Sequence, residues 1–245
     1  MIEIEIREFK KHDIQGGIVV DGLPNTGLVS PIFSSYLVGA LQLDQVACLD
    51  SEYFPPASMI FAGKPKFPAR IYASTNPRLA VFVAEFTPPP LLDRPLAKKI
   101  FSWAIEQKAS MIITSVPIPV LEDNEVDNDA PVLGVGSTQG AREMLAKAGV
   151  GQFDIGIITG TPGVLLNEGR WANFDVIALI VKAHPAAPDH RAAAKIIESL
   201  GKLVPGMRLD VGPLYEEATR IGTRLKMIRA QASESQTHPQ ENMYR

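Results

Sequence analysis

The residues best suited to bind another protein stand at the end of the chain: Met243, Tyr244 and Arg245. They follow residues 231–242, a polar stretch that can bury too little apolar surface to fold. Met and Tyr offer contact area to a pocket, and the terminal carboxylate of Arg245 offers a charge to a basic residue. The sequence of the tail therefore predicts a disordered segment whose last residues insert into a pocket of another protein. Chance would give an apolar-Tyr-any terminus in about 1% of chains of this composition.

A second candidate is the turn from Gly22 to Gly27, which joins a predicted strand to a predicted helix. In an α/β fold, backbone N–H groups around Gly22, Asn25, Thr26 and Gly27 could hold a phosphate at the start of that helix. The turn lacks the Gly-Lys-Ser/Thr of a P-loop and the glycine spacing of a dinucleotide site. A tight turn that needs glycine for positive φ is the alternative, and the sequence favours it.

Three further patterns predict no metal site and no cofactor. Residues 122–129 hold five carboxylates but lack the glycine and distant glutamate of an EF-hand, which favours a solvated loop. Residues 134–140 are one residue too long for a dinucleotide fingerprint, and they follow the acidic loop rather than a strand. His184 and His190 match no standard zinc spacing, and Asp189 between them is better used as a helix cap.

Composition excludes several classes of protein. The net charge of −3 and the pI of about 5.8 do not favour a nucleic-acid partner. No apolar run approaches the roughly 18 residues of a membrane span, and residues 1–11 alternate like an edge strand rather than a signal peptide. The lone Cys48 lies inside an apolar run, which fits a buried thiol in a reducing cytoplasm and no catalytic nucleophile.

Strand and helix patterns alternate along the chain. The predicted strands span residues 17–22, 46–50, 58–62, 70–74, 79–85, 111–116, 154–160 and 176–181. The predicted helices span residues 25–41, 96–108, 138–148, 162–170, 189–203 and 213–230. This alternation is typical of a single three-layer α/β/α domain with a largely parallel sheet. We expect that domain over residues 1–230, ending in a helix, and a disordered tail over residues 231–245.

Four segments resemble the proteasome-assembly-chaperone family, in its archaeal and bacterial branch. They are Gly22–Val29, Glu52–Pro56, Ile158–Leu166 and Asp189–Lys195. Each is short, but the four occur in the family's order, and the resemblance extends from about residue 16 to 228. Thr161-Pro162 departs from the small or Asn residues that are more usual in the third segment.

The resemblance gives the tail a specific meaning. In that group a hydrophobic-Tyr-any terminus inserts between adjacent α subunits of the proteasome, and its carboxylate meets a lysine. Carried over, Met243 is the hydrophobic position, Tyr244 is the tyrosine, and Arg245 supplies the carboxylate. The resemblance also implies a homo-oligomer. It predicts an ATP-independent chaperone or adaptor of the 20S proteasome, not an enzyme.

Two alternatives stay open at the level of sequence. The sheet topology of the family is thought to be similar to that of nucleoside phosphorylases and hydrolases, so an enzyme with a ligand at residues 22–27 is one alternative. A metabolite-binding protein with a fortuitous terminus is the other. The sequence offers no general base with a partner, which disfavours the enzyme.

Overall fold

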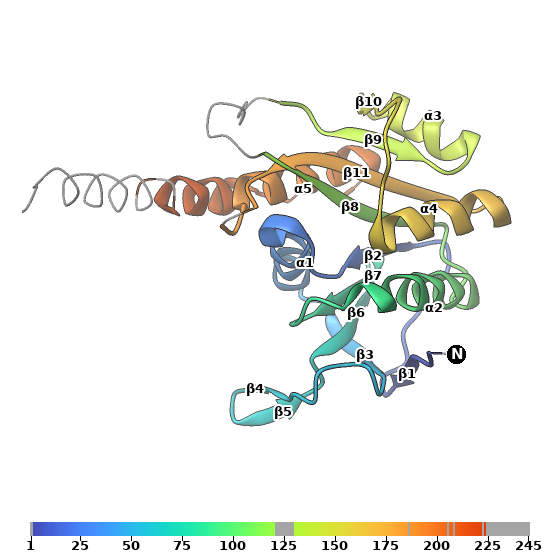
Figure 1. The fold of residues 1–245 in the computed structure, drawn as a ribbon, viewed down its shortest axis with the longest axis vertical. Helices are drawn as coiled ribbons and strands as arrows, with labels where there is room; N and C mark the ends of the chain where they lie inside the picture. The colour runs from blue at the N-terminus through green and yellow to red at the C-terminus, as the bar shows by residue number, and fades with distance from the viewer. Residues whose placement is uncertain are drawn as a thin grey trace, which may run out of the picture.

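A nine-stranded mixed sheet runs through the protein in the order β1-β3-β6-β7-β2-β8-β11-β9-β10 (Figure 1). The structure is a computed structural model, and it describes residues 2–120, 130–185, 187–204, 206–207, 209–221 and 223. The strands of this sheet are β1 (Glu5–Glu8), β2 (Ile18–Gly22), β3 (Asp44–Asp50), β6 (Ala69–Thr75), β7 (Arg78–Ala84), β8 (Met111–Pro119), β9 (Leu133–Gly136), β10 (Gly151–Gln152) and β11 (Asp175–Ala183). A separate hairpin pairs β4 (Met59–Phe61) with β5 (Lys64–Lys66).

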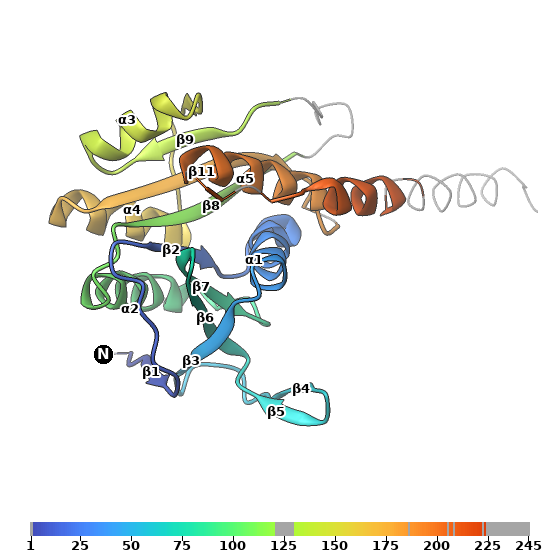
Figure 2. The ribbon, with the colours of Figure 1, turned by 180° about the vertical axis from the view of Figure 1, so that it is seen from behind.

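Helices cover both faces of the sheet (Figures 1 and 2). They are α1 (Val29–Ala40), α2 (Asp93–Glu106), α3 (Gln139–Lys147), α4 (Gly160–Ala172) and α5 (His190–Leu203), with short 3-10 turns at Thr26–Leu28 and Pro90–Leu92. Side chains of α1, α3 and α5 share one apolar core with the sheet, and those of α2 and α4 share a second core on the opposite face. Residues 212–221 are also helical. The predicted α/β/α class is confirmed.

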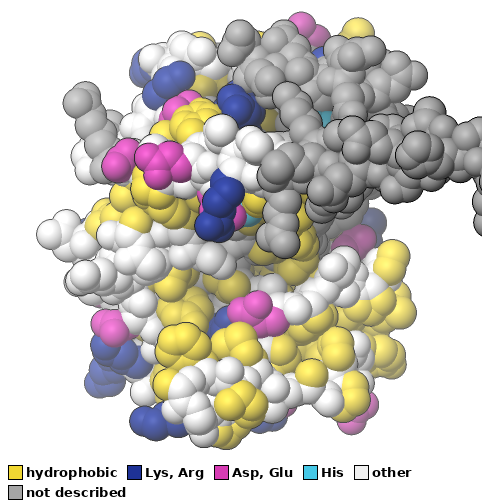
Figure 3. Space-filling model, turned by 90° about the vertical axis from the view of Figure 1, so that its left-hand side faces the viewer, with side chains coloured by type: hydrophobic (Ala, Val, Ile, Leu, Met, Phe, Trp, Pro, Cys, Tyr) yellow, Lys and Arg dark blue, Asp and Glu magenta, His cyan; other side chains and the backbone are white. Residues whose placement is uncertain are grey.

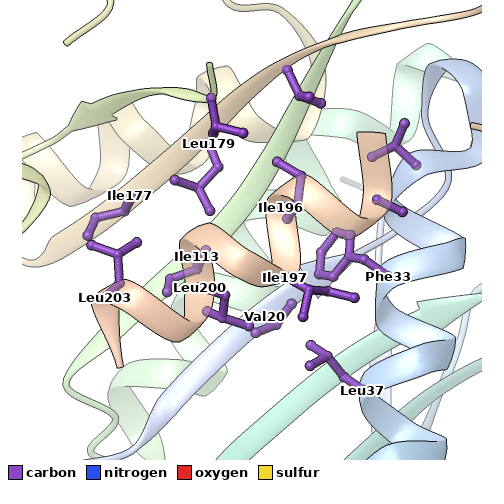
Figure 4. Packing of buried hydrophobic residues seen from close by; sticks show 14 of the residues in the cluster. Val20, Phe33, Leu37, Ile113, Ile177, Leu179, Ile196, Ile197, Leu200 and Leu203 are labelled. Carbon is purple, nitrogen blue, oxygen red and sulfur yellow. The ribbon is translucent and has the colours of Figure 1, made fainter. Parts of the chain in front are cut away.

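Helix α5 shows why the fold is stable on its face of the sheet. Ile196, Ile197, Leu200 and Leu203 lie on one side of the helix at three- and four-residue steps. Figure 4 shows them against residues from the central strands and α1. Ile196, Ile197 and Leu200 are at most 2% exposed, and burying each such side chain contributes roughly 1.5–3 kcal/mol.

The sheet is parallel in its centre and again at its short edge strand, where β10 pairs in parallel with β9. β7, β2, β8 and β11 pair in parallel, whereas β1, β3 and β6 pair antiparallel on one side and β9 pairs antiparallel with β11 on the other. Helical crossovers such as α2, between β7 and β8, return the chain to a parallel strand. The short turn at Asn76-Pro77 instead reverses it, so that β6 and β7 form an antiparallel hairpin.

Two predictions about individual elements are wrong. No strand forms over residues 154–160, which contain a bend at Ile155 and pair with no described strand before Gly160 begins α4. Residues 134–140 were not expected at a strand, yet residues 134–136 lie within β9 (Leu133–Gly136), and Thr138 then caps α3. The acidic loop at 122–129, the end of the last predicted helix and the tail lie outside the described residues. Within the described part of the chain, no helix is both long and apolar enough to cross a membrane.

Candidate binding surface at the carboxyl edge of the sheet

The four parallel strands end at one edge of the sheet, where ligands of α/β proteins usually bind. Residues 22–27 leave β2 at this edge, the loop before α2 leaves β7, and residues 184–189 leave β11. Figure 3 looks at this edge and shows apolar side chains gathered over its lower half. The exposed apolar side chains of these loops and of the β4–β5 hairpin include Leu28, Ile60, Phe61 and Leu91.

The two glycines of the predicted ligand turn serve close packing. A Cβ on Gly22 would lie 2.4 Å from the Cβ of Ser34 and 2.5 Å from the carbonyl oxygen of Phe82. Gly27 has φ 65°, and a Cβ there would lie 2.6 Å from the carbonyl oxygen of His184. The Gly27 carbonyl also accepts a hydrogen bond of 2.9 Å from the Asp189 amide. The turn is therefore joined directly to the loop before α5.

The side chain of Asn25 connects the start of α1 to strand β8. Its Oδ1 accepts from the amide of Ser30 at 3.1 Å, and its Nδ2 donates to Oγ of Ser115 at 3.1 Å. The Ser30 and Ser115 hydroxyls also bond each other at 2.5 Å. The sequence suggests Asn25 or Thr26 as the cap of this helix, but the N-cap of α1 is Leu28, which has no side-chain cap bond, and Asn25 instead reaches Ser30 in the first turn. Thr26 lies in the 3-10 turn that follows. Ligand binding by this turn stays a prediction.

A buried carboxyl group lies beside this turn. Asp21 is 4% exposed, and it accepts hydrogen bonds from Oγ1 of Thr114 at 2.8 Å and from the amide of Leu23 at 3.2 Å. Burial, with a smaller contribution from the charge of Asp93, raises the pKa of Asp21 to about 6, although the two hydrogen bonds act to lower it. Burial also raises the pKa of Asp93. Sequence reasoning missed Asp21 and Thr114, although each is a polar residue inside an apolar strand pattern.

The third family-like segment, residues 158–166, forms the start of α4. Gly160 has φ 71°, and a Cβ there would meet no atom closer than 3.7 Å. A Cβ on Gly163 would lie 2.3 Å from the carbonyl oxygen of Ile158, so this glycine allows the chain to fold back on itself. The nearest side chain to Gly160 is the carboxyl group of Asp93, which places the starts of α2 and α4 side by side.

The other predicted sites have simpler outcomes. Asp189 caps α5, since its Oδ1 accepts from the Ala192 amide at 2.9 Å while its Oδ2 accepts from the His184 amide. Among the described residues, no group of three His, Cys, Asp or Glu side chains could hold a metal ion. Cys48 is buried, as predicted. Met243, Tyr244 and Arg245 lie outside the described residues.

Two solved structures have the same fold over nearly the whole chain. The crystal structure of PbaA from Pyrococcus furiosus, an archaeal homolog of proteasome-assembly chaperone, has a TM-score of 0.81 and 29% identity, covering 95% of this chain and 94% of PbaA. The structure of PbaB, an archaeal proteasome activator of the same organism, has a TM-score of 0.78 and 22% identity, covering 94% of this chain and 100% of PbaB.

Sequence comparison agrees with the structural likeness. An uncharacterized protein of Methanocaldococcus jannaschii is 25% identical over 224 residues, which are 91% of this chain and 90% of that protein. The model of the PAC2 family matches residues 19–229, close to the range over which the sequence resembles proteasome-assembly chaperones. The chain therefore belongs to the PAC2 family.

Proposed function

We propose that this protein is an ATP-independent assembly chaperone or adaptor of the 20S proteasome, which binds α subunits through its C-terminal tail. The observation that carries the proposal is the likeness to PbaA, at 29% identity over 95% of the chain. The Met243-Tyr244-Arg245 terminus is a separate support. It is read from the sequence alone and lies outside the residues that the structure describes.

The proposed mechanism depends on weak contacts acting together. One tail offers an apolar side chain, an aromatic ring and a carboxylate, which is a small contact for a stable complex. A cytoplasmic homo-oligomer would present several tails to the several pockets of an α-ring. Each further contact is then intramolecular, and its effective concentration raises the total affinity. Helical residues 212–221 extend away from the sheet, which suits delivery of a tail to a partner (Figure 2).

Removal of the last three residues tests this proposal. We expect α-ring binding, measured by surface plasmon resonance, to weaken at least tenfold, the scale of losing a buried aromatic anchor. The melting temperature and the oligomeric mass should stay unchanged. Arg245→Ala is the matched control, because it keeps the terminal carboxylate and Tyr244. Equal affinity of the full chain and the shortened chain would remove the tail from the mechanism.

The enzyme alternative has one observation in its favour, the buried Asp21 with its raised pKa at the carboxyl edge. Against it, both oxygens of Asp21 already accept hydrogen bonds from within the domain. We therefore expect no phosphorolysis or hydrolysis of nucleosides. Turnover near 1 per second that Asp21→Asn abolishes would favour the enzyme.

A further inference from the structure

A cleft of about 330 Å³ lies between α4, the end of β9 and the segment that leads from β10 to α4 (Figure 1). Gly136 of β9 lines it and lies opposite Ile177, near the start of β11 at Asp175. Its described lining includes no residue of the turn at 22–27 or of the loop at 184–189. The cleft is therefore separate from the carboxyl edge of the sheet, and its volume suits a small molecule.

Two arginine side chains line this cleft from different helices. Arg142 belongs to α3, and Arg170 stands in the last turn of α4. Nη1 of Arg142 donates to the Gly136 carbonyl at 3.2 Å, and Nη2 donates to Oε1 of Gln139 at 3.1 Å. These bonds hold the guanidinium in place but use only part of its N–H donors. Arg142 therefore keeps donors for a ligand.

Arg170 has no counterion in the part of the chain that the structure describes. It is exposed and enters none of the ion pairs formed there. Gly156 and Ile158 also line the cleft, and their amides donate to no described carbonyl. The cleft thus holds charged and backbone donors that the described domain does not use. Donors of this kind are what an anionic group needs.

The charges of the cleft favour an anion with a single charge. Two arginines against one carboxylate, that of Asp154, leave one positive charge in excess. A dianion such as phosphate would add uncompensated negative charge beside Asp154, whereas a carboxylate would balance the excess. The planar fork of a guanidinium group also matches the geometry of a carboxylate.

Apolar residues form the remaining walls of the cleft. They are Val135, Phe153, Ile158 and Leu166. Phe153 packs closely on Gly156, since a Cβ there would lie 2.3 Å from the Cζ of its ring. A ligand that carries an apolar group next to its carboxylate would therefore find contact for both parts.

We propose that this cleft binds a small carboxylic acid with an apolar body. Its carboxylate accepts hydrogen bonds from Arg142 and Arg170, and its body packs on Phe153 and Leu166. The inference goes beyond the proposed function and does not rest on it. A single carboxylate joined to an apolar group is the shared chemistry of a free organic acid and of the end of a peptide, and the experiment distinguishes these two sources.

An NMR titration of the full chain with phenylacetate tests the site. Its neutral analogue phenylacetamide and inorganic phosphate are the comparisons. We expect phenylacetate to bind about tenfold more tightly than the amide, which cannot form charge-assisted bonds to both arginines. Phosphate should also bind more weakly, because it lacks the apolar body and carries more charge. Tighter binding of acetyl-Ala-Ala-Phe than of phenylacetate would assign the carboxylate to a peptide end, and weaker binding would assign it to a free acid.

Arg170→Gln is the main variant. Arg170 is exposed, so the variant should keep the melting temperature of the full chain while its affinity for phenylacetate falls about tenfold. Arg94→Gln is the matched control, because Arg94 is an exposed arginine of α2 outside the lining of the cleft. It should bind phenylacetate as the full chain does. Asp154→Asn should act in the opposite direction and tighten binding roughly two- to fivefold, since it removes a like charge.

Several outcomes would overturn the inference. They are unchanged binding in Arg170→Gln, equal loss in Arg94→Gln, equal affinity for phenylacetate and phenylacetamide, and phosphate binding as tight as that of phenylacetate. No binding of either carboxylate by the full chain would overturn it as well. None of these measurements involves a proteasome subunit, so their failure leaves the proposed function intact.

Discussion

The protein contains two glycine turns that lead into helices, and the fold treats them differently. At the first turn, residues 22–27, the loop before α5 lies against Gly27, and Asn25 is bonded to β8. At the second turn, the start of α4, a Cβ on Gly160 would meet Asp93 and Pro162 only at an ordinary contact distance of 3.7 Å, and residues 154–158 before it form no backbone hydrogen bonds among the described residues. Both turns belong to segments that resemble the same family.

The difference shows that a glycine motif does not by itself define a binding site. The first turn resembles a phosphate loop in sequence, but the rest of the domain fills the space beside it. The second turn has no such resemblance, yet an unpaired segment and a cleft lie next to it. What can bind is decided by the elements that come to lie beside the turn.

Alanine at Gly27 and at Gly160 separates packing from backbone strain. Both glycines have positive φ, 65° and 71°, so either substitution costs about 1–2 kcal/mol in strain. Only at Gly27 does the new Cβ meet a carbonyl oxygen at 2.6 Å, which adds roughly 1–3 kcal/mol. In urea unfolding we expect Gly27→Ala to be clearly the more destabilising of the two. Equal losses would mean that the first turn is as open as the second.

The pH dependence of the free energy of unfolding tests the burial of Asp21 beside the first turn. Its pKa is about 6 in the folded protein against 3.8 for the exposed group. The folded state therefore holds a proton that the unfolded state releases, and the free energy of unfolding falls as pH rises from about 4 through 6. The difference between the two pKa values corresponds to roughly 3 kcal/mol. Asp21→Asn should remove this loss, so it should stabilise the protein at pH 7 but not at pH 3.5.

The matched control for that variant is Asp154→Asn in the open segment. Asp154 is exposed, and surface substitutions usually change stability by less than about 0.5 kcal/mol. Urea unfolding of both variants and the full chain from pH 3.5 to 7 gives the comparison directly. A constant difference between Asp21→Asn and the full chain over this range would contradict the proposed protonation of Asp21.

Much of the fold could be predicted because burial leaves a periodic pattern in the sequence. The buried strand β11 reads as a continuous apolar run, and α5 reads as an apolar stripe. β9 escaped prediction because it has only four residues, two of them glycine. Residues 154–160 were predicted as a strand since alternation reports a preference for extended backbone. It does not report whether another strand lies alongside.

The candidate sites show the same limit. Asn25 has the residue type of a helix cap, but Leu28 is the N-cap of α1, and the bond of Asn25 to Ser115 joins residues 90 positions apart. The pKa of Asp21 is raised by burial in the core and by the charge of Asp93, whereas the hydrogen bond from Thr114 lowers it, and no local pattern reveals these partners. Chain order also hides the antiparallel pairing of β9 with β11, because the strand between the acidic loop and α3 could have joined either edge.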